Sequence, residues 1–167
     1  LKNDSLLCTL YGALGEYAAN IDADYYQAIQ WIYKGIELAQ VNRHKQQYGL
    51  LLSQLANTYY LKRDGNGLKY ALECYELGCE LQDNYLTYSG AIQSAYMYFL
   101  NKQHTQAMAY VQEAEVLMKQ NNFYDQAHTF NLLGQLLDEL GNYPQAMEYY
   151  QKAMKDKQTS QTSSVVY

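Results

Sequence analysis

The sequence predicts an all-α fold in which antiparallel helix–turn–helix hairpins stack side by side into an α-solenoid. The main observation is an alanine that recurs at positions 28, 71, 107 and 146, in steps of 43 (71−28), 36 (107−71) and 39 (146−107) residues. The chain of 167 residues holds a single proline, which favours long uninterrupted helices. Apolar residues make up 49% of it, enough to bury a continuous core.

A motif of small residues surrounds each of these alanines. Its clearest copy begins at Leu133-Gly134-x-x-Leu137, continues through the turn Gly141-Asn142-Tyr143-Pro144, and ends in Ala146-x-x-x-Tyr150-x-x-Ala153. Two further copies pair Leu55-Ala56-x-x-Tyr59 with Ala71, and Ser94-Ala95-x-x-Tyr98 with Ala107. We place the first copy at Tyr11-Gly12-x-x-Gly15, followed by Ala28.

Small residues are needed where two antiparallel helices touch, because only there can the backbones approach closely. We expect Gly12, Ala56, Ala95 and Gly134 on the first helices to face Ala28, Ala71, Ala107 and Ala146 on the second helices. One hairpin cannot bury its own apolar face, so neighbouring hairpins must stack. The alternative is a generic helical bundle in which the alanine spacing is accidental.

This motif resembles the tetratricopeptide repeat, with its L-G-x-x-Y, glycine turn and A-x-x-x-F pattern. The steps exceed the usual period of about 34 residues. We assign the surplus to polar inserts at 20–24 and 62–67. The resemblance implies one repeat domain over residues 1–167, with hairpins at 4–40, 43–82, 85–120 and 123–156. Residues 157–167 are predicted to begin a truncated fifth hairpin.

The predicted helices span 4–19, 24–40, 43–62, 67–82, 85–101, 104–120, 123–140 and 143–156. Asp4 and Asp24 are suitable N-caps. Gly141 suits a left-handed C-cap, and Pro144 suits a first helical turn.

No catalytic or metal-binding motif is found. The sequence lacks H-E-x-x-H, the glycine-rich phosphate loop and G-x-S-x-G. His44, His104 and His128 have no metal-binding spacing, and His104 is predicted to be solvated in a turn. The carboxylates beside Cys74 would raise the pKa of its thiol, which argues against a nucleophile. Cys8, Cys74 and Cys79 are interpreted as core fillers. We therefore expect no enzyme, no metal and no cofactor.

Charge and hydropathy limit the partners. The net charge is −5 and no basic cluster is visible, so direct nucleic-acid binding is not expected. No run of about 18 apolar residues can span a membrane. No signal peptide is visible, which favours a cytoplasmic location, but the chain begins at Leu1 and a removed leader or anchor stays an open alternative.

The resemblance implies a concave wall lined by the first helix of each hairpin. Aligning those helices on their small residues predicts a peptide-binding face made of Ser53, Gln54, Asn57, Tyr60, Gln93, Tyr96, Phe99, His128, Asn131 and Gln135. Amide side chains both donate and accept hydrogen bonds, so a row of them can hold an extended backbone. The aromatic residues would form pockets. The alternative is that these residues only solvate a groove.

The family's known carboxylate clamp uses Lys, Arg and Asn, and the aligned positions here carry no Lys or Arg. Binding of chaperone C-termini is therefore not expected. The function predicted instead is protein or peptide binding, as the sensory or partner-docking segment of a larger bacterial regulator. The alternative is a stand-alone scaffold for a multiprotein complex. Exposed array ends, including Val166 and Tyr167, are predicted to allow homo-oligomers.

Overall fold

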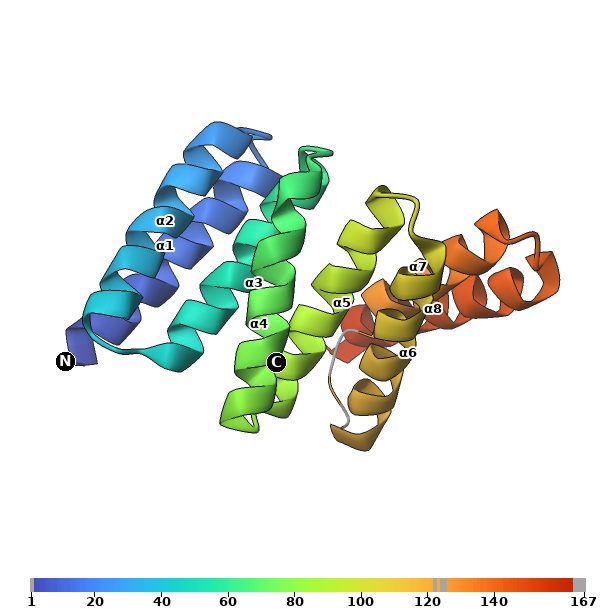
Figure 1. Cartoon of the computed structure of the whole chain (residues 1–167). Coiled ribbons are helices and arrows are strands. Elements are labelled where there is room, and N and C mark those ends of the chain that lie inside the picture. Colours follow the sequence, from blue (N-terminus) through green and yellow to red (C-terminus); the bar gives the residue numbers. More distant parts are fainter. Residues whose placement is uncertain (1, 122, 124–125, 164–167) are drawn as a thin grey trace.

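The structure is a stack of helical hairpins, as the sequence predicts (Figure 1). The computed structural model describes residues 2–121, 123 and 126–163. Within those residues the chain forms 8 α-helices and no strand. The hairpins are α1 (Lys2–Asn20) with α2 (Tyr25–Val41), α3 (Lys45–Leu61) with α4 (Leu68–Leu81), α5 (Asn84–Leu100) with α6 (His104–Asn121), and α7 (Ala127–Glu139) with α8 (Tyr143–Ser163). A short 3-10 helix, η1 (Gly65–Gly67), lies between α3 and α4.

The recurring small residues lie inside the hairpins. Ala28, Ala71 and Ala107 are fully buried on the second helices, and Ala56 and Ala95 are fully buried on first helices. Gly134 packs against α8, because a Cβ built on it would lie 2.6 Å from the ring of Tyr150. The register predicted for the last three hairpins is therefore confirmed.

The register predicted for the first hairpin is wrong by one helical turn. Gly15 is the glycine that faces α2, since a Cβ there would lie 2.5 Å from Cγ1 of Ile32. Gly12 instead lies under the side chain of Gln54 in α3. The two glycines are three residues apart and lie near each other on the helix surface, so the rotation of α1 against its neighbours decides their roles.

Most predicted helix ends are confirmed. Asp24 caps α2 by accepting a hydrogen bond from the Gln27 backbone N–H at 2.9 Å. Gly141 has φ +77°, and Pro144 lies in the first turn of α8. Asp4 is not an N-cap, because α1 already begins at Lys2.

The predicted break after residue 156 is absent. Helix α8 runs without interruption to Ser163, so residues 157–163 continue this helix rather than begin a new hairpin. The segment 155–163 contains no glycine or proline that would end a helix. Val166 and Tyr167 lie outside the described residues.

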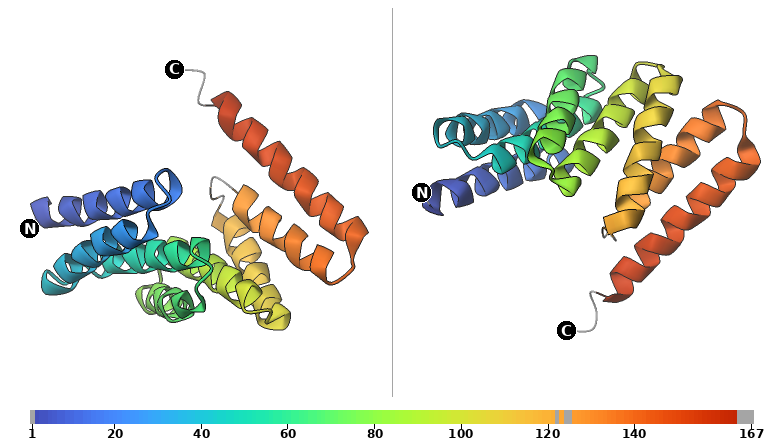
Figure 2. Two further views of the ribbon diagram at one scale, coloured as in Figure 1. Left: turned by 90° about the horizontal axis from the view of Figure 1, so that it is seen from above. Right: turned by 60° about the horizontal axis from the view of Figure 1, so that its bottom comes forward.

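The stack curves between its two ends, with α1 at one end and α8 at the other (Figure 2). The tightest junction joins the second and third hairpins. There Gly78 of α4 lies against the backbone of Thr87, and Gly90 of α5 lies against the backbone of Tyr75. Because the stack is curved, side chains of the first helices of all the hairpins line one groove.

Candidate functional site

One groove runs across the first helix of every hairpin. Its volume is about 710 Å³, and α1, α3, α5 and α7 all contribute side chains to it. Every residue predicted for the binding face lines this groove except Phe99; those that do are Ser53, Gln54, Asn57, Tyr60, Gln93, Tyr96, His128, Asn131 and Gln135. The positions selected by aligning the first helices on their small residues therefore lie together in the structure.

Phe99 was wrongly placed on the groove. Its side chain packs against the core of the last two hairpins, and its ring lies 6.0 Å from that of His104. The Nζ of Lys102 lies 5.6 Å from the centre of the same ring. Phe99 belongs to the last turn of α5, where the chain turns toward α6, so it stabilises that turn.

Some lining residues were not predicted from the sequence, namely Glu16, Asn20, Leu61, Tyr85 and Tyr88. Ser89 and Ile92, which the same alignment of the first helices turns inward, also line the groove. The error in the α1 register hid Glu16 and Asn20. With Gly15 as the small residue, Glu16 aligns with Asn57, Tyr96 and Gln135, each of which directly follows the small residue of its helix. The residue that directly follows the small residue lines the groove in every hairpin. Applied to α1 with Gly15 as the small residue, this rule predicts Glu16.

Contacts between neighbouring first helices hold the groove floor in place. The hydroxyls of Ser53 and Ser89 lie 2.7 Å apart and join α3 to α5. The rings of Tyr60 and Tyr96 lie 4.8 Å apart at the same junction. The Tyr96 hydroxyl also donates to the His128 carbonyl at 3.2 Å and joins α5 to α7. The groove is therefore largely preformed, which lowers the entropic cost of binding.

The groove lining is polar but nearly uncharged. Among the described residues, Glu16 is its one carboxylate, and no Lys or Arg belongs to it. Its amide side chains are Asn20, Gln54, Asn57, Gln93, Asn131 and Gln135. The Oε1 atoms of Gln54 and Gln93 are buried and accept no hydrogen bond from the described residues. Both oxygens are therefore acceptors whose hydrogen-bonding capacity is unused within the described part of the chain.

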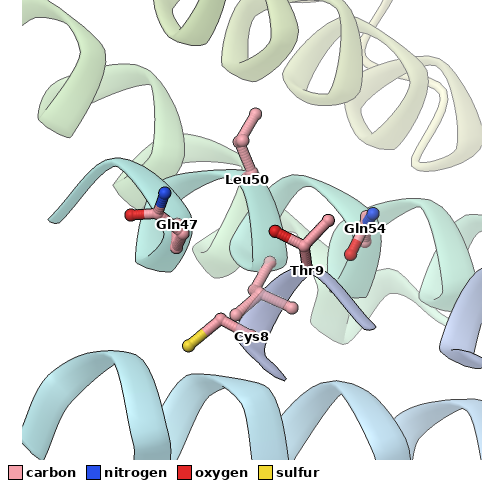
Figure 3. Close-up of a pocket in the computed structure, with 6 residues that line it drawn as sticks. Cys8, Thr9, Gln47, Leu50 and Gln54 are labelled. Carbon is pink, nitrogen blue, oxygen red and sulfur yellow. The ribbon is translucent and has the colours of Figure 1, made fainter. Parts of the chain in front are cut away.

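A second hollow lies between α1 and α3 but is far smaller (Figure 3). Its volume is about 60 Å³, and Cys8, Thr9 and Gln47 contribute to its wall. Space of that size holds water rather than an organic ligand. Burial raises the pKa of the Cys8 thiol, which makes it a poor nucleophile at neutral pH.

The other cysteines differ in position. Cys74 is fully buried, and burial, with a smaller effect of Asp83, raises the pKa of its thiol to about 12. Cys79 is exposed, so its interpretation as a core filler is wrong.

Among the described residues, no group of three or more His, Cys, Asp or Glu side chains is placed to hold a metal ion. None of the described helices combines the length and apolarity needed to cross a membrane.

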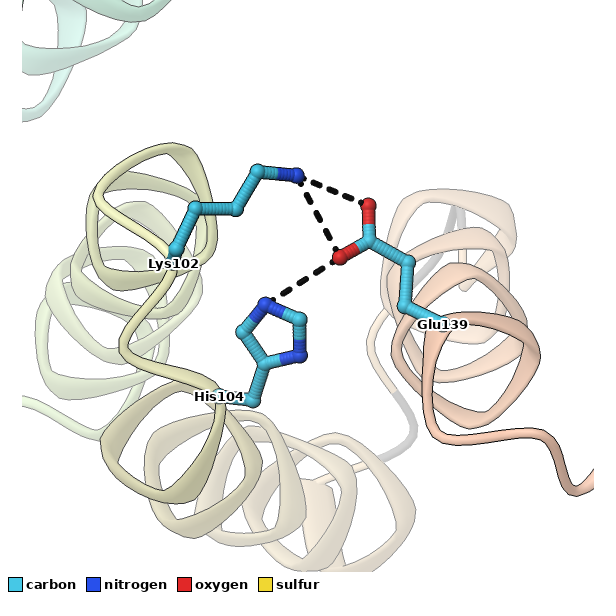
Figure 4. A network of polar contacts seen from close by, with 3 residues as sticks. All are labelled: Lys102, His104 and Glu139. Carbon is cyan, nitrogen blue, oxygen red and sulfur yellow. Dashed lines mark hydrogen bonds and ion pairs between the residues drawn. The ribbon is translucent and has the colours of Figure 1, made fainter.

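An ion-pair network ties the third hairpin to the fourth (Figure 4). Lys102 Nζ lies 3.1 Å from Oε1 of Glu139, and His104 Nε2 lies 3.1 Å from its Oε2. His104 is thus partnered by Glu139, and the prediction that it is solvated in a turn is wrong. The network joins the turn between α5 and α6, together with the start of α6, to the C-terminal end of α7.

Residues 86–158, which span nearly all of the third and fourth hairpins, match the model of the tetratricopeptide repeat family. This match supports assigning the third and fourth hairpins to the tetratricopeptide repeat family. Such repeats generally mediate protein–protein interaction, and their helical scaffold is typically non-catalytic. A search of curated proteins finds no match to the chain.

Proposed function

We propose that the groove binds an extended, largely uncharged peptide segment of a partner protein. The observation that carries this proposal is the lining itself, in which amide side chains from four helices and tyrosine side chains from α3 and α5 share one preformed groove. An extended backbone offers N–H and C=O groups at every residue, and amides can bind both kinds. Affinity then comes from the ligand backbone and selectivity from contacts of the ligand side chains with the tyrosine rings.

The charge of the groove narrows the ligand class. An acidic ligand would lose hydration without gaining a cationic partner, because the lining has no Lys or Arg. Glu16 stands at the α1 end, so a single basic residue of the ligand is favoured at that end only. Nucleic acid is a poor ligand for the same reason, since phosphate binding requires cationic side chains.

Asn57 and Asn131 provide the test, because they line the groove from α3 and α7. A random peptide library selected on the protein supplies a defined ligand, whose Kd is then measured by calorimetry. Removing two hydrogen-bonding amides costs roughly 1–3 kcal/mol in total, so Asn57→Ala with Asn131→Ala is expected to weaken binding about 5- to 150-fold.

A matched control removes two amides from the opposite side of the array. Gln112 and Gln120 are exposed on α6, and Gln112→Ala with Gln120→Ala is expected to leave the Kd unchanged. Selected peptides should be poor in Asp and Glu. Equal affinity of the groove variant and the wild type would refute the proposed face.

The wider role proposed is partner docking or sensing within a larger bacterial regulator, and the alternative is an assembly scaffold. An effector module, such as a helix-turn-helix or a kinase, next to this array in the full-length gene product supports the regulator. A full-length product built only of repeats supports the scaffold. We also propose self-association through the array ends, since terminal repeats expose apolar faces.

A further inference from the structure

Tyr85 is the most exposed of the four tyrosines that line the groove among the described residues. It is 54% exposed, whereas Tyr88 is 8% exposed and Tyr60 and Tyr96 are partly buried. The hydroxyl of Tyr88 lies 3.0 Å from that of Thr129, and the rings of Tyr60 and Tyr96 pack against each other. Those three rings are therefore engaged within the fold, while most of the Tyr85 side chain stays available to a ligand.

Neighbouring groups hold the Tyr85 ring in place. The ring of Phe123 stands at 87° to it with the two centres 5.5 Å apart, and the centre of the Tyr88 ring lies 6.3 Å away. The backbone N–H of Tyr85 donates to the carboxylate of Asp83, the N-cap of α5, at 3.1 Å. The ring is thus supported by the fold although it is exposed, so little of its freedom remains to be lost when a ligand binds.

The fold does not require an aromatic ring at this position. Aligned on the small residues of the first helices, Tyr85 corresponds to Ser5 in α1 and to Gln46 in α3. Both of these residues are polar, and Gln46 is exposed. A tyrosine that keeps more than half of its surface in water also contributes less to folding than a buried one. The ring at this position is therefore better explained by binding than by packing.

The exposed ring is continuous with the groove. Along α5, Tyr85, Tyr88, Ile92 and Tyr96 follow one another in steps of three and four residues, which places them on one face of the helix. All four line the groove, as does Ser89. A peptide that lies along α5 therefore passes over the Tyr85 ring, and the stripe beneath it carries no charged side chain.

We propose that Tyr85 forms a subsite for an aromatic side chain of the peptide ligand and so sets a sequence preference of the groove. The inference rests on the peptide binding proposed above. Aromatic rings gain from edge-to-face and offset contacts in addition to the apolar area that they bury. A ligand ring placed on the exposed part of Tyr85 extends the edge-to-face arrangement that Tyr85 already forms with Phe123. Tyrosine is also among the residues that most often dominate the energy of an interface.

A basic side chain of the ligand is the competing occupant, because a cation can lie over a tyrosine ring. Asp83 is the nearest carboxylate in sequence, but it already accepts hydrogen bonds from the N–H groups of Tyr85 and Leu86 and from the amide of Gln46. Little of its accepting capacity is left for a ligand cation. The surroundings of the ring therefore favour a neutral aromatic group.

Peptides selected from the random library test this subsite. We expect them to share one aromatic residue at a fixed position. Tyr85→Ala should raise the Kd of such a peptide about 30-fold or more, the range of an interface hot spot. Tyr85→Phe keeps the ring and should leave the Kd unchanged. Tyr85→Gln introduces the residue of the equivalent position in α3, so it should keep the melting temperature and lose affinity as Tyr85→Ala does.

A double-mutant cycle shows whether the two rings contact each other. Replacing the aromatic residue of the peptide by alanine should weaken binding to the wild type by a similar factor. The same replacement should cost little further in Tyr85→Ala, because the contact is already lost there. Tyr26→Ala is the matched control, since Tyr26 is an exposed tyrosine of α2 that does not line the groove, and it should leave the Kd unchanged.

Three results overturn the subsite: an unchanged Kd in Tyr85→Ala, additive effects in the cycle, or selected peptides with a basic residue or no shared aromatic residue. Failure of the subsite is distinguishable from failure of the groove. If Asn57→Ala with Asn131→Ala weakens binding and Tyr85→Ala does not, only the subsite is refuted. If neither variant weakens binding, the peptide groove is refuted together with it.

Discussion

Gly90 of α5 lies directly against the backbone of Tyr75 in α4. A Cβ added to Gly90 would collide with the backbone N and Cα of Tyr75, which cannot move away as a side-chain tip can. This contact sets the distance between the second and third hairpins. It therefore helps to define the part of the groove that lies between α3 and α5.

Gly90→Ala should destabilise the array, although alanine ordinarily favours a helix by about 1 kcal/mol over glycine. Overpacking at a rigid backbone contact costs roughly 1–3 kcal/mol, so we expect a lower melting temperature. Gly134→Ala is the matched control. Its Cβ would meet the ring of Tyr150, which can turn aside, and its loss of stability should be smaller. Equal stability of the two variants would contradict the rigid crossing.

Ala107 tests the close approach of α5 and α6. It is fully buried, whereas Ala109 on the same helix is exposed. Ala107→Leu should lower the unfolding free energy by roughly 1–3 kcal/mol, because the helices must separate to admit the larger side chain. Ala109→Leu should change it little. Chemical denaturation of both variants measures the difference, and similar values would argue against the register.

A tyrosine pair makes the array sensitive to alkali. The rings of Tyr59 and Tyr70 stack 5.6 Å apart, and burial raises the pKa of each phenol from its ordinary 10.0 to about 12. Above pH 10 the unfolded chain ionises these phenols while the folded chain keeps them neutral. Their contribution to stability is thus complete below about pH 10 and is lost as the pH rises toward 12.

Melting temperatures measured from neutral pH to about pH 11 check this expectation. Tyr59→Phe with Tyr70→Phe should make the alkaline decline shallower than in the wild type. Tyr26→Phe removes an exposed tyrosine and should leave the slope as it is. A steeper or unchanged slope in the double variant would show that the pair does not govern alkaline unfolding.

The Lys102–His104–Glu139 network should contribute little to stability (Figure 4). Lys102 is 70% exposed, so solvent and salt screen the pair. Glu139→Gln should cost less than about 1 kcal/mol at low salt, and the difference should vanish at high salt. Glu148→Gln removes an exposed carboxylate of α8 and serves as the control. A large loss at high salt would mean that Glu139 acts through packing.

Much of the candidate site was predictable because the spacing within a helix is local. Once Ala56 and Gly134 are recognised as the small residues that face the second helix, the helical period places Asn57 and Asn131 on the neighbouring face of their own helices. The same reasoning predicted Gly141 as a helix end, because its backbone conformation suits glycine. Whether any peptide occupies the groove stays a prediction.

Residue order by itself determined the helical class, the pairing of helices into hairpins and the groove positions of α3, α5 and α7, because these follow from contacts between residues close in sequence. Tertiary structure decided the remainder. It rotated α1 so that Gly15 and not Gly12 meets α2, and it turned Phe99 toward the core. The rotation of a helix about its own axis depends on every neighbour that packs against it. The spacing within that helix does not contain this information.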